Sequence, residues 1–309
     1  MKNKKVLVVL GGTSGEREVS LDSGKACVKA LIKKGYKVST FDPKKNNFNL
    51  IDKSKTDIIF NALHGKDGED GIAQSYFEYL RIPYTHSGVI SSHNAMNKII
   101  SKKIFKEKKI KTPLYFVLKR RNFNKVLLNK SIKQKKIKFP MVIKPVNEGS
   151  SIGVKISKSM KELITVSKSL FKKYPELIFE QFIGGQEIQV AVINGIPLGA
   201  IELKPKRKFY DYKAKYTKSA KTKHIMPANL KKTKYNEVLK IAKKAHKSLE
   251  CKGVTRSDFK FLNNKFYLLE INTQPGMTNL SLVPEIALYK GISFENLVEK
   301  ILLNASLDR

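Results

Sequence analysis

Three oxygen-bearing side chains are brought together by the pattern of the sequence VTRSDFKFLNNKFYLLEIN, residues 254–272. Two strand-like runs are separated by two successive asparagines, which are typical of a tight hairpin turn. Because the side chains of a strand alternate between its faces, Glu270 and Asn272 share one face of the second run. Pairing the apolar faces of the two runs places Asp258 on the same face.

The same alternation predicts both faces of this hairpin. Phe266 and Leu268 are expected on the face of Glu270. The opposite, apolar face is expected to consist of Phe259, Phe261, Leu269 and Ile271. Two carboxylates and an amide suit a hard cation such as Mg²⁺, which takes one or two protein carboxylates together with substrate phosphates and water. A solvated hairpin face would carry the same residues, so the hairpin alone leaves both interpretations open.

Two loops rich in small residues follow strand-like runs. GGTSGEREVS, residues 11–20, opens a helix-like run, which is where α/β sheets bind ligands, although it matches neither G-x-G-x-x-G nor the P-loop pattern. Glu16 in this loop could hold an ammonium group, or the loop could be a simple turn. NEGSSIG, residues 147–153, follows Lys144, and its backbone N–H groups together with the lysine charge suit phosphate; a flexible surface hairpin is the alternative.

A Gly-Gly turn lies between Glu180 and Glu187 in FEQFIGGQEIQV. A segment of this kind can offer its backbone donor and acceptor to an adenine edge, while a nearby carboxylate takes ribose hydroxyls. Two solvent-exposed glutamates beside a turn would look the same.

The elements that must position these residues divide the chain near Asn97. Before it, strand-like and helix-like runs alternate, which predicts a parallel, doubly wound sheet. Ser20 is expected to cap the first helix and Gly35 to end it. After Asn97, short runs joined by glycine turns predict antiparallel sheets, with one helix around 160–172.

The composition is basic, with 61 basic and 26 acidic residues and a formal net charge of +35. Only seven of the basic residues are arginines, the preferred residue for bidentate recognition of phosphates and bases, and the 54 lysines are spread along the chain. The densest run, residues 119–138, is expected to be a solvated peripheral face. We therefore expect no specific nucleic-acid partner, with a basic nucleic-acid-binding protein as the alternative from another class.

Three features of the sequence indicate the cellular compartment of the protein. Cys27 and Cys251 show no CxxC spacing, which favours a reducing environment. The N-terminal apolar run is too short for a signal peptide, and no run is long enough to cross a membrane. We expect a cytoplasmic protein without a membrane partner.

Taken together, these stretches resemble the D-alanine–D-alanine ligase family of the ATP-grasp superfamily along nearly the whole chain. The matching stretches are GGTSGEREVSLDSG, LHGKDGEDG, FPMVIKPVNEGSSIGV, FEQFIGGQEIQVAVING, FYDYKAKYT, GVTRSDFKF and LLEINTQPGMTNLSLVPE. The resemblance implies an α/β (α+β) protein: an N-terminal doubly wound parallel α/β substrate-binding domain, residues 1–97, followed by a two-part ATP-grasp unit with antiparallel sheets, residues 98–309. The unit would comprise a central subdomain, 98–180, and a C-terminal catalytic subdomain, 181–309.

The resemblance also implies the nucleotide and metal sites. The phosphates of ATP would meet Lys98, Lys144 and Lys215. Adenine would lie against Glu180, Gln181, Phe182 and Ile183, and ribose against Glu187. The ligands of Mg²⁺, expected as two ions that Mn²⁺ can replace, would be Asp258, Glu270 and Asn272.

The substrate and catalytic residues are implied in the same way. Glu16 and His64 would hold the first D-alanine, and Ser281 with Leu282 the carboxylate of the second. Arg256 and the backbone of Gly276 would stabilise the oxyanion. Tyr216 would hydrogen-bond towards Ser150, and Ser150 towards Glu16, when the lysine-rich segment 213–227 closes over the site.

The implied activity is ATP-dependent ligation of two D-alanine molecules through an acyl phosphate, which supplies a peptidoglycan precursor. The expected partners are D-alanine, ATP and a second copy of the chain in a homodimer. Another ATP-grasp ligase, such as one that makes D-alanyl-D-lactate, is the alternative among enzymes; in similar ligases a tyrosine at position 216 accompanies an amine as the second substrate. Residues 119–138 match no motif of the family.

Overall fold

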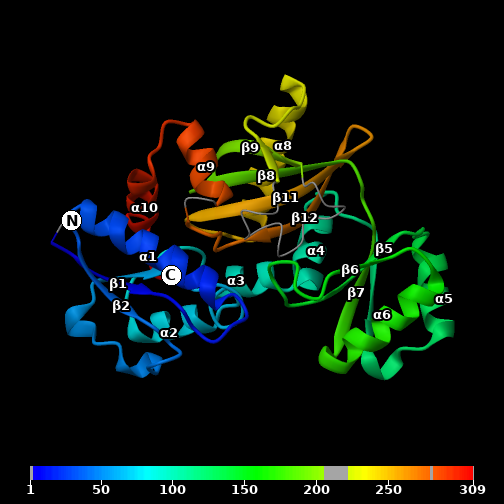
Figure 1. Cartoon of the computed structure of the whole chain (residues 1–309), viewed down its shortest axis with the longest axis horizontal. Coiled ribbons are helices and arrows are strands. Elements are labelled where there is room, and N and C mark those ends of the chain that lie inside the picture. The colour runs from blue at the N-terminus through cyan, green and yellow to red at the C-terminus, as the bar shows by residue number, and fades with distance from the viewer. Residues whose placement is uncertain (1–2, 205–221, 279–280, 309) are drawn as a thin grey trace.

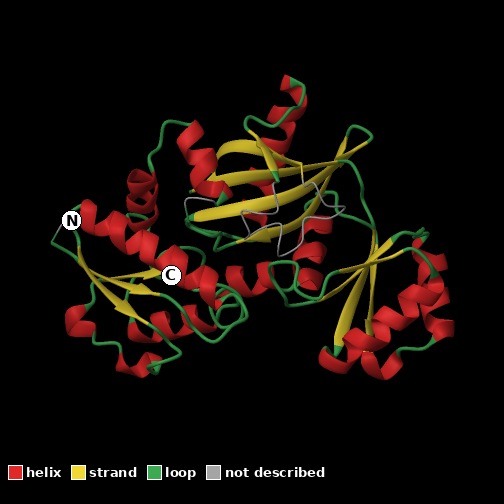
Figure 2. Cartoon of the chain, in the orientation of Figure 1, coloured by secondary structure: helices red, strands yellow, loops and turns green. Residues whose placement is uncertain are grey.

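The computed structural model describes residues 3–204, 222–278 and 281–308, and three β-sheets organise them (Figure 1). Figure 2 shows each sheet with helices packed on it. One sheet is parallel and the other two are antiparallel, as predicted.

The parallel sheet has the order β2-β1-β3. Its strands are β1 (Lys5–Val9), β2 (Lys37–Phe41) and β3 (Ile58–Asn61), and the helices around it are α1 (Arg17–Lys33), α2 (Ile72–Leu80) and α3 (Val89–Met96). Alternate residues of β1 enter two cores: Val6 and Val8 pack in the core that contains α1, and Leu7 and Val9 in the core that contains α2. Helices on both faces confirm the doubly wound arrangement. Short 3-10 helices occur at Phe48–Leu50 and Lys53–Lys55.

The predicted limits of α1 are right at one end only. Gly35, with φ of +86°, ends the helix as expected, because glycine takes this left-handed conformation without strain. The prediction that Ser20 caps the helix is wrong, since α1 begins three residues earlier and Glu16 occupies the cap. Ser20 Oγ instead accepts a hydrogen bond from Gly11 N (2.8 Å) and donates one to Ala62 O (2.7 Å), which fixes the loop after β1.

The second sheet has the order β4-β7-β5-β6 and carries two helices. Its elements are β4 (Tyr115–Lys119), β5 (Met141–Pro145), β6 (Lys155–Ser157), β7 (Glu176–Gln181), α5 (Lys125–Lys135) and α6 (Met160–Lys173). The lysine-rich run 119–138 forms a 3-10 helix (Arg120–Asn122) and α5, in which Leu128 is the one buried residue. This run is therefore a largely solvated face, as predicted.

The third sheet has the order β10-β9-β8-β11-β12 and is the centre of the molecule (Figure 1). Its strands are β8 (Gln186–Ile193), β9 (Ile196–Lys204), β10 (Lys223–Ile225), β11 (Val254–Leu262) and β12 (Lys265–Asn272), and the remaining helices are α4 (Lys98–Glu107), α8 (Lys232–Ser248), α9 (Leu282–Tyr289) and α10 (Phe294–Leu302). One face packs on α8. The other face shares a single core with α9, α10 and α1, which joins this sheet to the parallel sheet.

The hairpin of β11 and β12 contains a bulge that alternation did not predict. Asp258 pairs with Glu270, but the next residue, Phe259, pairs with Leu268, so Leu269 is extra. Leu269 and Glu270 consequently line the same cavity although they are consecutive. The expected position of Asp258 beside Glu270 is confirmed, and the turn at Asn263 and Asn264 has the positive φ angles of a tight hairpin.

The bulge reverses the faces predicted for the rest of β12. Phe266 and Leu268 lie in the core against α8 with Phe259 and Ile271, not on the face of Glu270. Leu269 lies on the polar face, not the apolar one. A regular strand could not bury Leu268 and Ile271 while exposing both residues between them, so the bulge is what satisfies both requirements.

No helix in the described residues is both long and apolar enough to cross a membrane.

The bulge predicts unequal costs for two neighbouring leucines. Leu268 is fully buried, so Leu268→Ala is expected to lower the free energy of unfolding by about 2–5 kcal/mol through lost burial and a residual cavity. Leu269→Ala is the matched control and should cost clearly less, because Leu269 is half-buried at a cavity wall. Urea unfolding followed by circular dichroism measures both, and a larger loss for Leu269→Ala would contradict the bulged register.

Candidate active site

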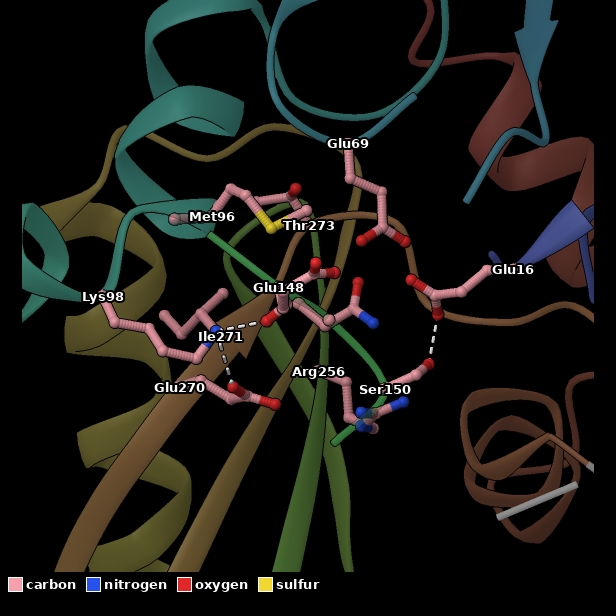
Figure 3. Close-up of a pocket in the computed structure, with 13 residues that line it drawn as sticks. Glu16, Glu69, Met96, Lys98, Glu148, Ser150, Arg256, Glu270, Ile271 and Thr273 are labelled. Atoms are coloured by element: carbon pink, nitrogen blue, oxygen red, sulfur yellow. Dashed lines mark hydrogen bonds and ion pairs between the residues drawn. The ribbon is translucent and has the colours of Figure 1, made fainter. Parts of the chain in front are cut away.

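Two adjoining cavities lie where the three sheets approach one another, and they share Lys98, Glu148 and Glu270. The first extends from this shared wall to Glu16 in the loop after β1 (Figure 3). The second extends between β5, β7 and β12 towards the turn after β7. A lining that combines apolar side chains with charged groups is typical of a small-molecule site.

The hairpin contributes oxygen ligands to both cavities, and each carboxylate faces a cation. Arg256 donates two hydrogen bonds to Asp258, of 2.7 and 3.0 Å, and Lys98 Nζ lies 3.6 Å from Glu270. Asn272 Oδ1 accepts a hydrogen bond from Gln274 N (2.7 Å). Within the described residues there is no group of three His, Cys, Asp or Glu side chains that could hold a metal ion. Two carboxylates and one amide beside a lysine-lined cavity are oxygen donors of the kind that Mg²⁺ takes together with substrate and water.

The second cavity combines apolar walls with a polar end. Val142, Val154 and Leu269 provide the apolar surface. The end of β7 and the turn after it supply the predicted residues Glu180, Gln181, Phe182 and Ile183. Glu187 lies at its edge and pairs with Lys260, whose Nζ is 2.8 Å from Glu187 Oε2. Alternation along the strand predicts Lys260 on the same face as Asp258, near the oxygen-bearing patch, but the sequence assigned it no role.

A buried ion cluster lies behind this cavity. Glu180 Oε1 is 3.0 Å from Lys102 Nζ, and Oε2 is 3.0 Å from Lys144 Nζ. Burial alone would raise the pKa of the Glu180 carboxyl, but the two lysines outweigh it and hold the pKa below its usual value. Burial lowers the pKa of Lys102 to about 8 and also lowers that of Lys98, against the attraction of Glu270. Lys102 was missed from the sequence; its one signal is a position one helical turn after Lys98.

The loop 147–153, which joins β5 to β6 in the second sheet, contacts the loop after β1. Ser150 donates a hydrogen bond to Glu16, as predicted (Figure 3). A Cβ on Gly149 would lie 2.9 Å from Glu16 Oε2, so a larger residue there would displace the Glu16 carboxylate. Ser150 and Ser151 both have positive φ, of +47° and +61°, a costly conformation for side chains other than glycine that is often found at functional sites.

His64 is close to the first cavity but does not line it. Its Nδ1 lies 3.1 Å from Glu69 Oε1 and its Nε2 lies 3.2 Å from Ser23 Oγ, so both nitrogens are occupied. Glu69 lines the cavity in its place (Figure 3). The sequence analysis included Glu69 in the stretch LHGKDGEDG without singling it out.

The residues predicted for the second substrate lie together beyond the two cavities. Thr278 N donates to Ser281 Oγ (3.0 Å), and a Cβ on Gly276 would lie 3.0 Å from the same oxygen. Leu282 is buried at the start of α9. Of the other predicted residues, Lys215 and Tyr216 lie outside the described part of the chain.

Similarity to known proteins agrees with this geometry. Residues 104–303 match the family model described as D-ala D-ala ligase C-terminus. The chain is 56% identical over 306 residues to a D-alanine–D-alanine ligase of Pelagibacter ubique, and the match covers 99% of each chain.

Two solved structures share the fold. A D-alanine–D-alanine ligase of Bacillus anthracis, complexed with ATP, gives a TM-score of 0.85 at 32% identity, covering 97% of each chain. The VanG D-Ala:D-Ser ligase of Enterococcus faecalis gives a TM-score of 0.84 at 28% identity, covering 97% of this chain and 98% of its own. With an antiparallel hairpin carrying Asp258 and Glu270, a lysine-lined cavity beside it and these relatives, the chain belongs to the D-alanine–D-alanine ligase family.

Proposed function

We propose that this enzyme joins two molecules of D-alanine with the consumption of ATP, and so supplies a precursor of peptidoglycan. The observation that carries the proposal is the wall of Lys98 and Glu270 shared by two cavities. A nucleotide in the second cavity would present its terminal phosphate at this wall. An amino acid held near Glu16 in the first cavity would present its carboxylate to the same point.

For the nucleotide, we propose that adenine lies against residues 180–183 and ribose against Glu187. Lys98, Lys144 and Lys215 would hold the phosphates. The apolar walls and the buried lysines of the second cavity support this assignment, since a planar base and a polyanion need these two environments.

For the metal, Asp258, Glu270 and Asn272 would hold Mg²⁺, which when bound neutralises phosphate charge. We propose that two Mg²⁺ ions bind there and that Mn²⁺ can replace them. Hard oxygen donors on adjoining strands support it.

The first D-alanine would be held through its ammonium group by Glu16, with His64 supporting the site through Glu69. A carboxylate is a poor electrophile, so its oxygen would first take the γ-phosphoryl group, forming an acyl phosphate and ADP. The amine of the second D-alanine, with its carboxylate near Ser281 and Leu282, would attack the acyl carbon. Arg256 and the Gly276 N–H would stabilise the oxyanion before phosphate leaves.

Closure over this site would involve Tyr216, which we propose to bond towards Ser150. The hydrogen bond from Ser150 to Glu16 supports the half of this link that the structure describes.

We also propose a cytoplasmic location and three domains, at residues 1–97, 98–180 and 181–309. Each sheet falls within one range apart from Gln181, the last residue of β7.

A different second substrate is the other candidate function. The similarity to a D-Ala:D-Ser ligase at nearly the same TM-score means that this fold accommodates more than one acceptor. D-Serine and D-lactate are therefore the acceptors to test against D-alanine.

The activity is tested by phosphate release and product analysis. We expect purified protein with ATP, Mg²⁺ and D-alanine to release one phosphate for each D-alanyl-D-alanine formed, and to prefer D-alanine over D-serine and D-lactate when they are mixed with it. L-Alanine is the control. Phosphate release without dipeptide, or a product with D-serine or D-lactate in excess, would contradict the proposed acceptor.

The metal assignment predicts that Glu270→Gln lowers kcat at least about 100-fold, because the amide removes one anionic ligand and one partner of Lys98. The side chain is partly exposed, so the melting temperature should change little. The matched control is Glu237→Gln, which breaks a 2.7 Å pair with Lys234 on α8, outside both cavities. Near-normal Mg²⁺-dependent turnover of Glu270→Gln would remove Glu270 from the metal site.

We further propose a homodimer that buries the outer face of α2 and α3. Ile72, Tyr76 and Tyr79 share one face of α2, Ile90 lies on α3, and all four are exposed, Tyr79 by 83%. Neighbouring exposed apolar side chains of this kind mark association surfaces.

Light scattering should give twice the 35.1 kDa mass of one chain, and Tyr79→Glu should shift the mass to that of a monomer. Val126→Glu, at an equally exposed site on α5, is the control; a monomeric wild type would overturn the dimer.

A further inference from the structure

Lys102 does not line the second cavity, but it contacts Glu180, which does. Its side chain is 1% exposed and does not line the second cavity, whereas Lys144 and Glu180 do. Its ammonium group lies 3.0 Å from Glu180 Oε1 and 5.4 Å from the centre of the Tyr115 ring on β4. The cavity-lining residue that Lys102 contacts directly is therefore Glu180.

Glu180 divides its two oxygens between two lysines. Oε1 faces Lys102 and Oε2 faces Lys144, each at 3.0 Å. Lys102 Nζ and Glu180 Oε1 lack the alignment of a hydrogen bond, so their attraction is mainly that of opposite charges. The cluster holds two ammonium groups and one carboxylate, which leaves one positive charge in excess, and Lys144 is the member of the pair that faces the cavity.

Stability alone does not account for a second lysine here. Burying an ammonium group costs free energy, and an attraction to one carboxylate often does no more than repay it. Lys144 and Glu180 would already form a balanced pair without Lys102. An additional buried cation behind a cavity already lined by Lys98, Lys144 and Lys260 points to a role in binding an anion.

We propose that Lys102 is a positioning residue for ATP: by neutralising Glu180 from behind, it leaves the Lys144 ammonium group available to the nucleotide phosphates. This inference rests on the proposed function, because it takes ATP as the occupant of the second cavity. Without Lys102, the full charge of Glu180 would act on the lysines of the cavity wall, Lys144 first, and the remaining Lys144–Glu180 pair would be electrically neutral.

The test compares Lys102→Met with Lys103→Met. Methionine keeps the length of the buried side chain and removes its charge, and the remaining Lys144–Glu180 pair is balanced, so the fold should persist. Lys103 is the next residue on α4 and is exposed, which makes it a matched control for loss of one lysine. We expect Lys102→Met to raise KM for ATP about tenfold, with kcat and KM for D-alanine within about twofold of wild type, and Lys103→Met to leave all three unchanged.

Calorimetric titration with ATP and Mg²⁺, in the absence of D-alanine, measures nucleotide affinity without turnover and should show the same weakening for Lys102→Met. The double variant Lys102→Met/Glu180→Gln provides the second measurement. The neutral amide at position 180 no longer attracts the Lys144 ammonium group as a carboxylate does. We therefore expect the double variant to bind ATP more tightly than Lys102→Met does.

Equal ATP affinity for Lys102→Met and Lys103→Met would overturn the inference. So would a loss of kcat, both KM values and melting temperature together, which is the signature of a structural defect. A wild type that binds ATP but forms no dipeptide overturns the proposed function alone, since the binding comparison still decides the role of Lys102. A wild type that binds no nucleotide overturns both.

Discussion

The bulge at Leu269 is the constraint on which the arrangement of the site depends. β12 must bury Leu268 and Ile271 against α8 and also direct Glu270 into the cavity opposite Asp258. A strand with strict alternation cannot do both, because residues an odd number apart lie on opposite faces. The extra residue moves the second half of the strand by one position, and the cost is one locally disrupted step of the ladder. The hairpin can thereby be a core element along one part and a ligand-binding element along the other.

Opposite charges are paired throughout the site before any ligand is considered. Asp258 is held by Arg256, Glu270 faces Lys98, Glu187 faces Lys260, and Glu180 faces two lysines. For Glu180, burial alone would raise the pKa of the carboxyl, and the two lysines outweigh it and hold the pKa below its usual value. The same pairs hold lysines at the wall where phosphate charge is expected. The carboxylates and the lysines therefore hold each other in position.

Patterns confined to a few residues were predictable from the sequence. Alternation and turn chemistry predicted the parallel sheet, the hairpin and the position of Asp258 beside Glu270, and the resemblance supplied the other residues that are proposed for the site. The bulge was not predictable, because the four residues Phe266 to Leu269 are all apolar and alternation cannot show which of them is extra. The predicted cap at Ser20 failed because the helix begins at Arg17, and the Ser20 hydroxyl makes tertiary hydrogen bonds, accepting from Gly11 N and donating to Ala62 O.

The lysines show why position carries more information than composition. Within α4, Lys98 and Lys102 are buried in ion pairs, while Lys103 and Lys106 on the same short helix are exposed. Exposed charges of this kind are screened by salt over roughly 10 Å, whereas buried ones act at nearly full strength on their neighbours. A net charge of +35 counts both kinds equally, and most of it lies in solvent-facing stretches such as α5. The electrostatics that matter for binding an anion are therefore those of a few buried lysines, and only the three-dimensional ion pairs with Glu270 on β12 and Glu180 on β7 identify them.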